Sequence, residues 1–161
     1  MRVAVVMGSL SDLPKLESMI EILKSYDVKT DVRCLSAHRA HGKLIEFIEE
    51  VNNNGTSVII AAAGMAAALP GVIASQTVLP VIGVPISGKN LDGMDALFSI
   101  AQMPPGIPVA TVAIDGGKNA AYLALQMLAL NNKELSDKLK QDRVEMENKA
   151  LAANDEIQSK Y

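Results

Sequence analysis

The sequence predicts an α/β fold built on a parallel β-sheet. Short apolar runs of β type alternate along the chain with segments whose apolar residues recur at helical spacing. The first of these runs is rich in valine throughout, as in strands that are covered on both faces. Alanine and glycine are abundant while aromatic residues make up only 3% of the chain, so helices can approach a sheet closely.

The first third of the chain supplies two strands and two helices. Residues 2–7 form the valine-rich run, and the apolar stripe over residues 12–26 predicts a helix. Residues 28–35 alternate apolar and polar side chains, which indicates a second strand. A second helical stripe covers residues 43–51 and ends at the asparagine-rich run before Gly55.

The middle of the chain continues the alternation. Residues 57–62 and 81–84 predict the third and fourth strands. Between them Pro70 and Gly71 interrupt the helical pattern, so we expect a loop followed by a short helix. The remaining expected elements are a helix over residues 92–102, a strand over 109–114 and a small-residue helix over 118–130.

From Asn132 onward charged residues are dense and apolar residues are sparse. This pattern is typical of a solvated helix. We therefore expect a catalytic α/β domain over residues 1–131, with residues 132–161 as a charged helical extension of the same domain.

Charge and cysteine content exclude several classes of protein. The net charge of −3 gives no attraction to nucleic acid or to an anionic membrane, so we expect neither as a partner. Cys34 is the only cysteine, which excludes an intrachain disulfide and indicates a reducing compartment. No apolar run resembles a signal peptide or reaches the roughly 20 residues of a membrane span. We expect a cytoplasmic protein.

The middle of the chain carries unusually little charge. From Ser57 to Ile114 the only charged residues are Lys89, Asp92 and Asp95. So little solvating charge indicates a central core together with surface that other subunits cover. We therefore expect a homo-oligomer.

Three loops at predicted strand ends carry the candidate chemistry, because open parallel sheets bind ligands there. The first contains Gly8, Ser9, Ser11 and Asp12 directly before a helix. Free amides and hydroxyls at a positive helix end can hold a phosphate, and Asp12 can accept hydrogen bonds from sugar hydroxyls. Simple helix capping is the alternative, since serine and aspartate are preferred capping residues.

The second loop contains Ser36, Ala37, His38 and Arg39. Histidine carries protons near neutral pH, and the guanidinium group of arginine matches the oxygens of phosphate or carboxylate. A capping or surface role for His38 is the alternative. The loop therefore predicts an acid–base residue next to an anion-binding residue.

A metal site is a further alternative for this loop. Cys34, His38 and His41 could converge on zinc, but Cys34 lies within a predicted strand and no acidic residue nearby completes the ligand set. We expect no metal.

The third loop spans residues 62–71 and has almost no side-chain chemistry. Gly64, Met65, Ala66 and Leu69 can approach a flat ring closely in an apolar pocket while backbone amides bind a carboxylate. Tight packing in the core is the alternative.

Together the three loops resemble the class I 5-(carboxyamino)imidazole ribonucleotide mutase family. Its Gly-Ser-x-Ser-Asp, Ser-Ala-His-Arg and Ala-Gly-x-Ala-Ala-x-Leu-Pro-Gly loops match residues 8–12, 36–39 and 63–71. The resemblance extends over roughly residues 1–140.

The resemblance implies a three-layer α/β/α, flavodoxin-like domain with a central parallel sheet and an extended C-terminal helix, assembled as an octamer. It implies isomerisation of 5-(carboxyamino)imidazole ribonucleotide to 4-carboxy-5-aminoimidazole ribonucleotide in purine biosynthesis, without metal or cofactor. His38 would be the catalytic acid–base. The substrate would be bound by Gly8, Ser9, Ser11, Asp12, Ser36, Ala37, Arg39, Gly64, Met65, Ala66 and Leu69.

This chain departs from the family pattern at two positions. Ala68 stands where the family usually has histidine, and His41 stands where it usually has proline. Two alternative functions stay open: direct carboxylation of aminoimidazole ribonucleotide by carbon dioxide, which is the nearest enzyme alternative, and nucleotide binding without catalysis, which only Ala68 suggests.

Overall fold

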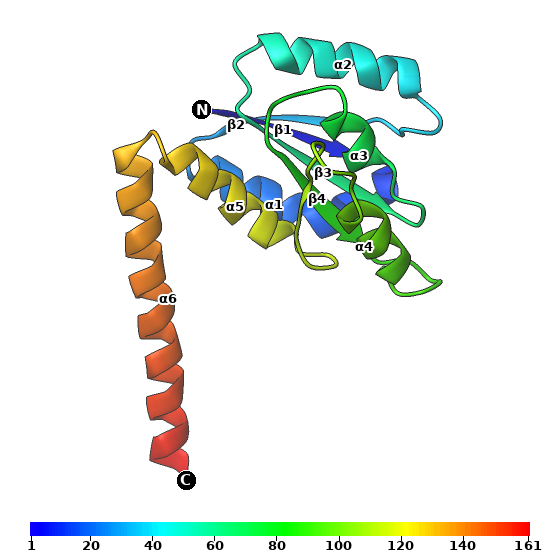
Figure 1. Ribbon diagram of the computed structural model, residues 1–161. Coiled ribbons are helices and arrows are strands. Elements are labelled where there is room, and N and C mark those ends of the chain that lie inside the picture. The colour runs from blue at the N-terminus through cyan, green and yellow to red at the C-terminus, as the bar shows by residue number, and fades with distance from the viewer. The chain divides into compact units, whose positions relative to one another are not determined.

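A computed structural model describes all residues, 1–161, in two compact units, Met1–Leu125 and Gln126–Tyr161. The first unit contains a five-stranded sheet in the order β2-β1-β3-β4-β5, and every pairing is parallel (Figure 1). This is the flavodoxin-like order. The strands are β1 (Arg2–Met7), β2 (Lys29–Cys34), β3 (Val58–Gly64), β4 (Val81–Ile86) and β5 (Ala110–Thr111).

Helices follow each strand, which confirms the predicted alternation. A short 3₁₀ helix, Leu10–Asp12, leads directly into the first α-helix. The α-helices are α1 (Leu13–Ser25), α2 (His41–Asn53), α3 (Leu69–Ala74), α4 (Met94–Ala101), α5 (Gly117–Ala129) and α6 (Lys133–Lys160). The helix α5 belongs to the first unit as far as Leu125.

Two helical layers cover the sheet, as expected for a three-layer fold (Figure 1). On one face Ala4 and Val6 of β1 share a continuous core with α2, α3 and α4. Their neighbours Val3 and Val5 point to the other face, because successive side chains of a strand alternate. There α1 and the first turns of α5 bury their small and apolar residues.

Two local expectations were wrong in detail. Pro70 and Gly71 lie within the first turn of α3 rather than in a loop before it. Proline is tolerated there because the first amides of a helix have no intrahelical acceptor. The strand β5 is also shorter than the predicted residues 109–114, since regular pairing with β4 stops after Thr111.

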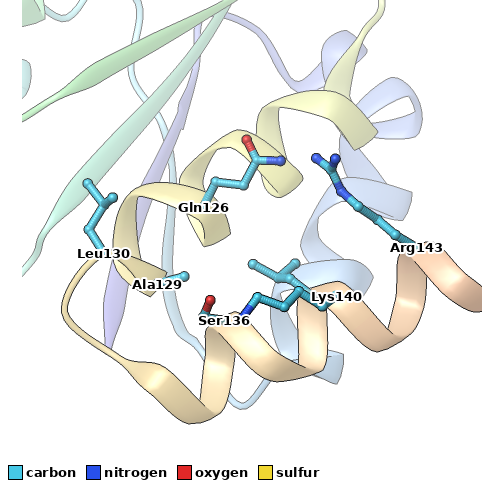
Figure 2. Close-up of a pocket in the computed structure, with 7 residues that line it drawn as sticks. Gln126, Ala129, Leu130, Ser136, Lys140 and Arg143 are labelled. Carbon is cyan, nitrogen blue, oxygen red and sulfur yellow. The ribbon is translucent and has the colours of Figure 1, made fainter.

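The second unit, Gln126–Tyr161, consists of the end of α5, a turn and α6. The Asn132 side chain caps α6 by accepting a hydrogen bond from the Leu135 amide at 3.0 Å. An open pocket of about 320 Å³ lies between the end of α5 and the first turns of α6 (Figure 2). It is lined by Gln126, Ala129, Leu130, Ser136, Leu139, Lys140 and Arg143. None of the helices combines the length and apolar character that crossing a lipid bilayer requires.

Gly83 fixes how closely α4 packs on the sheet. A Cβ atom at this position of β4 would collide with Ile100 Cγ2 and would meet Val109 Cγ1 at 2.8 Å. Overpacking of this kind costs typically about 1–3 kcal/mol. We therefore expect Gly83→Ala to lower the free energy of unfolding by that amount, measured by urea denaturation. Gly42→Ala is the control because nothing lies within 4 Å of its added Cβ; an equal loss in both variants would contradict the packing argument.

Candidate functional site

The carboxyl ends of four neighbouring strands lie level at one edge of the sheet. Met7 of β1 pairs with Cys34 of β2 and with Ala62 of β3, while Gly64 pairs with Ile86 of β4. The three loops singled out in the sequence leave this edge from β1, β2 and β3. Since strand order reverses at β1, with β2 on one side and β3 on the other, they surround the point where such sheets bind ligands.

The first loop is ordered by hydrogen bonds of its own side chains. The Ser9 amide donates to Asp12 Oδ2 at 3.2 Å, and the Ser11 amide donates to Ser9 Oγ at 3.4 Å. Ser11 Oγ also donates to Ser9 Oγ at 2.9 Å. These contacts form a capping box around the 3₁₀ helix, so the capping role considered for this loop is present. The Ser11 side chain is exposed and Ser9 is half-buried, which leaves both hydroxyls accessible to a ligand.

Asp12 is the one charged residue among the buried side chains, with 8% of its surface exposed. Burial raises the pKa of this carboxyl above its ordinary value, while hydrogen bonds from Ser9 and Ser11 and the charge of Lys15 act in the opposite direction. A carboxylate placed this way holds strong acceptor capacity in a poorly solvated position.

The second loop is a tight turn closed by Ser36. The Ala40 amide donates to the Ser36 carbonyl at 2.9 Å, and the Arg39 amide donates to Ser36 Oγ at 3.3 Å. Ala37 is half-buried, whereas the side chains of His38 and Arg39 are exposed. The turn therefore presents an imidazole and a guanidinium group at the carboxyl edge of the sheet.

His41 directly follows this turn as the first residue of α2, and Cys34 is the exposed last residue of β2. The structure has no group of three or more His, Cys, Asp or Glu side chains placed to hold a metal ion. Cys34, His38 and His41 thus do not form the metal-binding group considered from the sequence.

The third loop begins at Gly64, which pairs with Ile86 of β4. A Cβ atom on Gly64 would lie 3.1 Å from the Ile86 carbonyl oxygen, so a side chain there would require a small shift of the neighbouring backbone. Met65 follows with a left-handed φ of 57°, and both Met65 and Ala66 are exposed. Leu69 is buried in the core, and its Cδ2 atom lies near Gly8 of the first loop. The first and third loops therefore stand side by side.

A second polar group at this edge was missed in the sequence. Ser87 follows β4 and Asp115 follows β5, and Lys15 reaches both from α1. The signal that could have found it is the one used for the other loops, a polar side chain directly after a strand. For Ser87 that signal is hidden because β4 extends two residues beyond its predicted end, and nothing local indicates that Lys15 joins Ser87 and Asp115.

The sequence and the structure of this chain are similar to those of known proteins. The family model described as AIR carboxylase matches residues 2–149. A protein of Saccharolobus solfataricus named N5-carboxyaminoimidazole ribonucleotide mutase is 50% identical over 94% of this chain and 96% of its own. One of the same name from Escherichia coli is 51% identical over 86% of this chain and 83% of its own. Among solved structures, Treponema denticola PurE superposes with a TM-score of 0.86 at 28% identity, covering 93% of this chain and 94% of that one.

The raised pKa of Asp12 predicts how a substitution alters stability with pH. A carboxyl whose pKa is higher in the folded than in the unfolded state contributes stability at low pH, and this contribution is lost as pH rises through the folded value. Asp12→Asn removes that titration. The variant should therefore gain stability relative to the unchanged protein as pH rises, measured as urea midpoints between about pH 4 and 7.

The control for this measurement is Asp27→Asn, which removes an exposed carboxylate. A stability difference for Asp12→Asn that shrinks as pH rises would show that burial does not dominate at this carboxyl.

Proposed function

The chain belongs to the AIR carboxylase family, and on that premise we propose that it is a 5-(carboxyamino)imidazole ribonucleotide mutase in which His38 is the acid–base residue. The observation that carries the proposal is the meeting of the Gly8–Asp12, Ser36–Arg39 and Gly64–Leu69 segments at one edge of the sheet. One edge thus offers hydroxyls, a carboxylate, an imidazole, a guanidinium group and a largely apolar loop.

The reaction moves one carboxyl group, and the proton gained at nitrogen is balanced by the proton lost from the ring carbon. The bond between the exocyclic nitrogen and the carboxylate carbon breaks, carbon dioxide is released, and the nitrogen gains a proton. The ring carbon then attacks carbon dioxide, and the tetrahedral centre formed there loses its proton to restore the aromatic ring. One group must therefore donate a proton and later accept one, which suits an imidazole.

His38 is our candidate for that group because its ring is exposed at the sheet edge rather than used inside the fold. The freed carbon dioxide must stay beside the ring carbon until it reacts, since dilution into solvent would lose the advantage of proximity. We assign this confinement to the loop of Gly64, Met65 and Ala66, with Leu69 closing its base.

The other polar residues would hold the ribonucleotide. Asp12, with Ser9 and Ser11, is suited to bind the ribose and the adjoining phosphate. The Gly8 amide donates a hydrogen bond to the Ala62 carbonyl at 3.1 Å, which fixes where this loop starts. Arg39 and Ser36 are suited to the phosphate, with Ala37 leaving room beside them.

The experiment that tests this function incubates the purified protein with freshly made 5-(carboxyamino)imidazole ribonucleotide, without ATP or metal. Conversion to the ring-carboxylated product that does not depend on bicarbonate supports the mutase. Conversion only of aminoimidazole ribonucleotide with high bicarbonate would show a carboxylase instead. Binding without either product would show a non-catalytic protein, the alternative that Ala68 brings forward.

We expect His38→Asn to lower kcat by at least about 100-fold, the lower end of what a positioned acid–base group contributes. Asparagine keeps polarity and similar size but cannot carry a proton. His41→Asn is the matched control, because it changes the chain's other histidine at the start of α2. Near-unchanged turnover in His38→Asn would remove this residue from the mechanism.

We further propose that the protein works in the cytoplasm as a homo-oligomer, with the octamer implied by its resemblance to the mutase family. Exposed apolar side chains support the association of several chains: along α4 and the preceding loop, 69% of Leu91 and 57% of Phe98 are accessible. Sedimentation velocity should give a mass several times the 17.1 kDa of one chain. A monomer at micromolar concentration would contradict the oligomer.

A further inference from the structure

The helix α6 is covered by little of its own chain. Leu135 is its one buried residue, and every side chain from Arg143 to Tyr161 is exposed. Large apolar groups are among them, since 49% of Met146 and 55% of Ile157 are accessible. Most of the stability of a helix in a protein comes from packing of its apolar face, so a helix of 28 residues with so little cover indicates a partner.

One face of α6 carries side chains at alternating spacings of four and three residues. Side chains at this spacing lie in line along a helix, and two such lines pack together in a coiled coil. All members of the line except Arg143 are apolar. We call this line the α6 seam, and it consists of Leu139, Arg143, Met146, Ala150, Ala153 and Ile157.

The spacing of the α6 seam is the same from either end, with its midpoint at position 148. Two antiparallel copies of α6 therefore place every seam residue opposite another seam residue. Most facing pairs join a large side chain to a small one, which is how closely packed interfaces fill space. The facing pairs are Leu139 with Ile157, Arg143 with Ala153 and Met146 with Ala150.

A parallel pair of helices suits the α6 seam less well. It would place identical residues opposite each other, so two Arg143 guanidinium groups would meet and two alanine positions would be left underfilled. In the antiparallel pair the two Arg143 residues are separated along the helix axis by about 15 Å. Each then faces Ala153, which leaves room for the apolar stem of the arginine while its charged end reaches solvent.

The charges of α6 also favour the antiparallel pair. Residues 133–143 contain four basic and three acidic side chains, whereas residues 144–160 contain two basic and four acidic ones. Antiparallel pairing places the basic part of one helix beside the acidic part of the other. Parallel pairing would place like beside like, which costs free energy.

The pocket of Figure 2 lies at one end of the α6 seam. Leu139 belongs to both the pocket and the seam, and Ala129 and Leu130 add apolar surface to the pocket. Leu130 is 82% exposed, so this apolar surface lacks a cover within the chain. In the antiparallel pair the side chain opposite Leu139 is Ile157 of the second copy, which brings an apolar group to the pocket.

We propose that the α6 seam is an interface on which α6 of a second copy packs antiparallel, with Ile157 of that copy seated in the pocket beside Leu139. The proposal rests on the proposed homo-oligomer and adds to it the surface and the orientation of one contact. The exposed side chains of Leu91 and Phe98 remain for contacts with further copies, as an assembly of more than two chains requires.

The test introduces Leu139→Cys together with Ile157→Cys, after Cys34→Ser has removed the natural thiol. These two positions are about 27 Å apart within one helix, far beyond the reach of a disulfide, so a link between them joins two chains. We expect mild oxidation to give a covalent dimer on a denaturing gel without reductant. Arg143→Cys with Ala153→Cys gives the same test at two exposed positions, in case replacement of the half-buried Leu139 disturbs folding.

Two single variants in the Cys34→Ser background establish the orientation. Leu139→Cys alone should give no dimer, because the two cysteines of an antiparallel pair lie about 27 Å apart along the axis. A parallel pair would link them. Asn148→Cys should also give no dimer, since position 148 is at the midpoint but on the side of the helix opposite the seam.

A matched pair of substitutions tests the packing of the seam. Ala150→Glu places a charge opposite Met146, whereas Ala152→Glu makes the same change on the outer side of the helix. In the Leu139→Cys/Ile157→Cys protein, we expect Ala150→Glu to slow formation of the dimer roughly 10-fold, because an unpaired charge opposes burial. Ala152→Glu should leave the rate within about twofold, and equal slowing by both would contradict the seam.

The outcomes separate this proposal from the proposed function. Absence of a dimer in both double variants, or a dimer from Leu139→Cys alone, would overturn the antiparallel interface. If sedimentation velocity still gave a multiple of the chain mass, the homo-oligomer would stand and its contacts would lie elsewhere, as on α4. A specific dimer from a protein without mutase activity would overturn only the function.

Discussion

Parallel pairing of β1 with both β2 and β3 is the constraint on which the rest of the structure depends. Parallel strands end at the same edge, so the loops after residues 7, 34 and 64 must leave the sheet close together. The pairing also requires a crossover connection between successive strands, and the helices in these connections produce the two covering layers. Both the core and the candidate site thus follow from one arrangement of strands.

The candidate site contains two locally unfavourable features that the stable sheet must tolerate. Asp12 keeps a carboxylate where burial disfavours charge, and Met65 adopts a left-handed backbone that costs a non-glycine residue about 1–2 kcal/mol. Met65 directly follows β3, and Asp12 ends the 3₁₀ helix that follows β1; the residues of both strands are almost wholly buried. A well-buried sheet can therefore carry a buried carboxyl and a strained backbone at positions where ligand contact is expected.

Most of the fold could be predicted from the sequence because its signals are local. Apolar runs and helical stripes mark nearly every element, and the loops after the first three strands follow from their order. The cluster of Lys15, Ser87 and Asp115 could not be predicted in this way. Its members are separated by 72 and 28 positions along the chain, and they meet only because β4 and β5 end beside the start of α1. The early end of β5 could not be predicted for the same reason, because pairing with the neighbouring strand decides where an edge strand stops.

The short β5 also has a consequence for how copies of this chain can associate. An edge strand with unpaired amides and carbonyls invites another strand to join the sheet, but β5 offers only two residues for such pairing. At the opposite edge β2 carries Lys29, Asp31 and Arg33, and charges there discourage the same event. Extension of the sheet from one molecule to the next is thus disfavoured at both ends, so ordered assembly is left to contacts between helices and loops, and uncontrolled β-aggregation of the folded protein is suppressed.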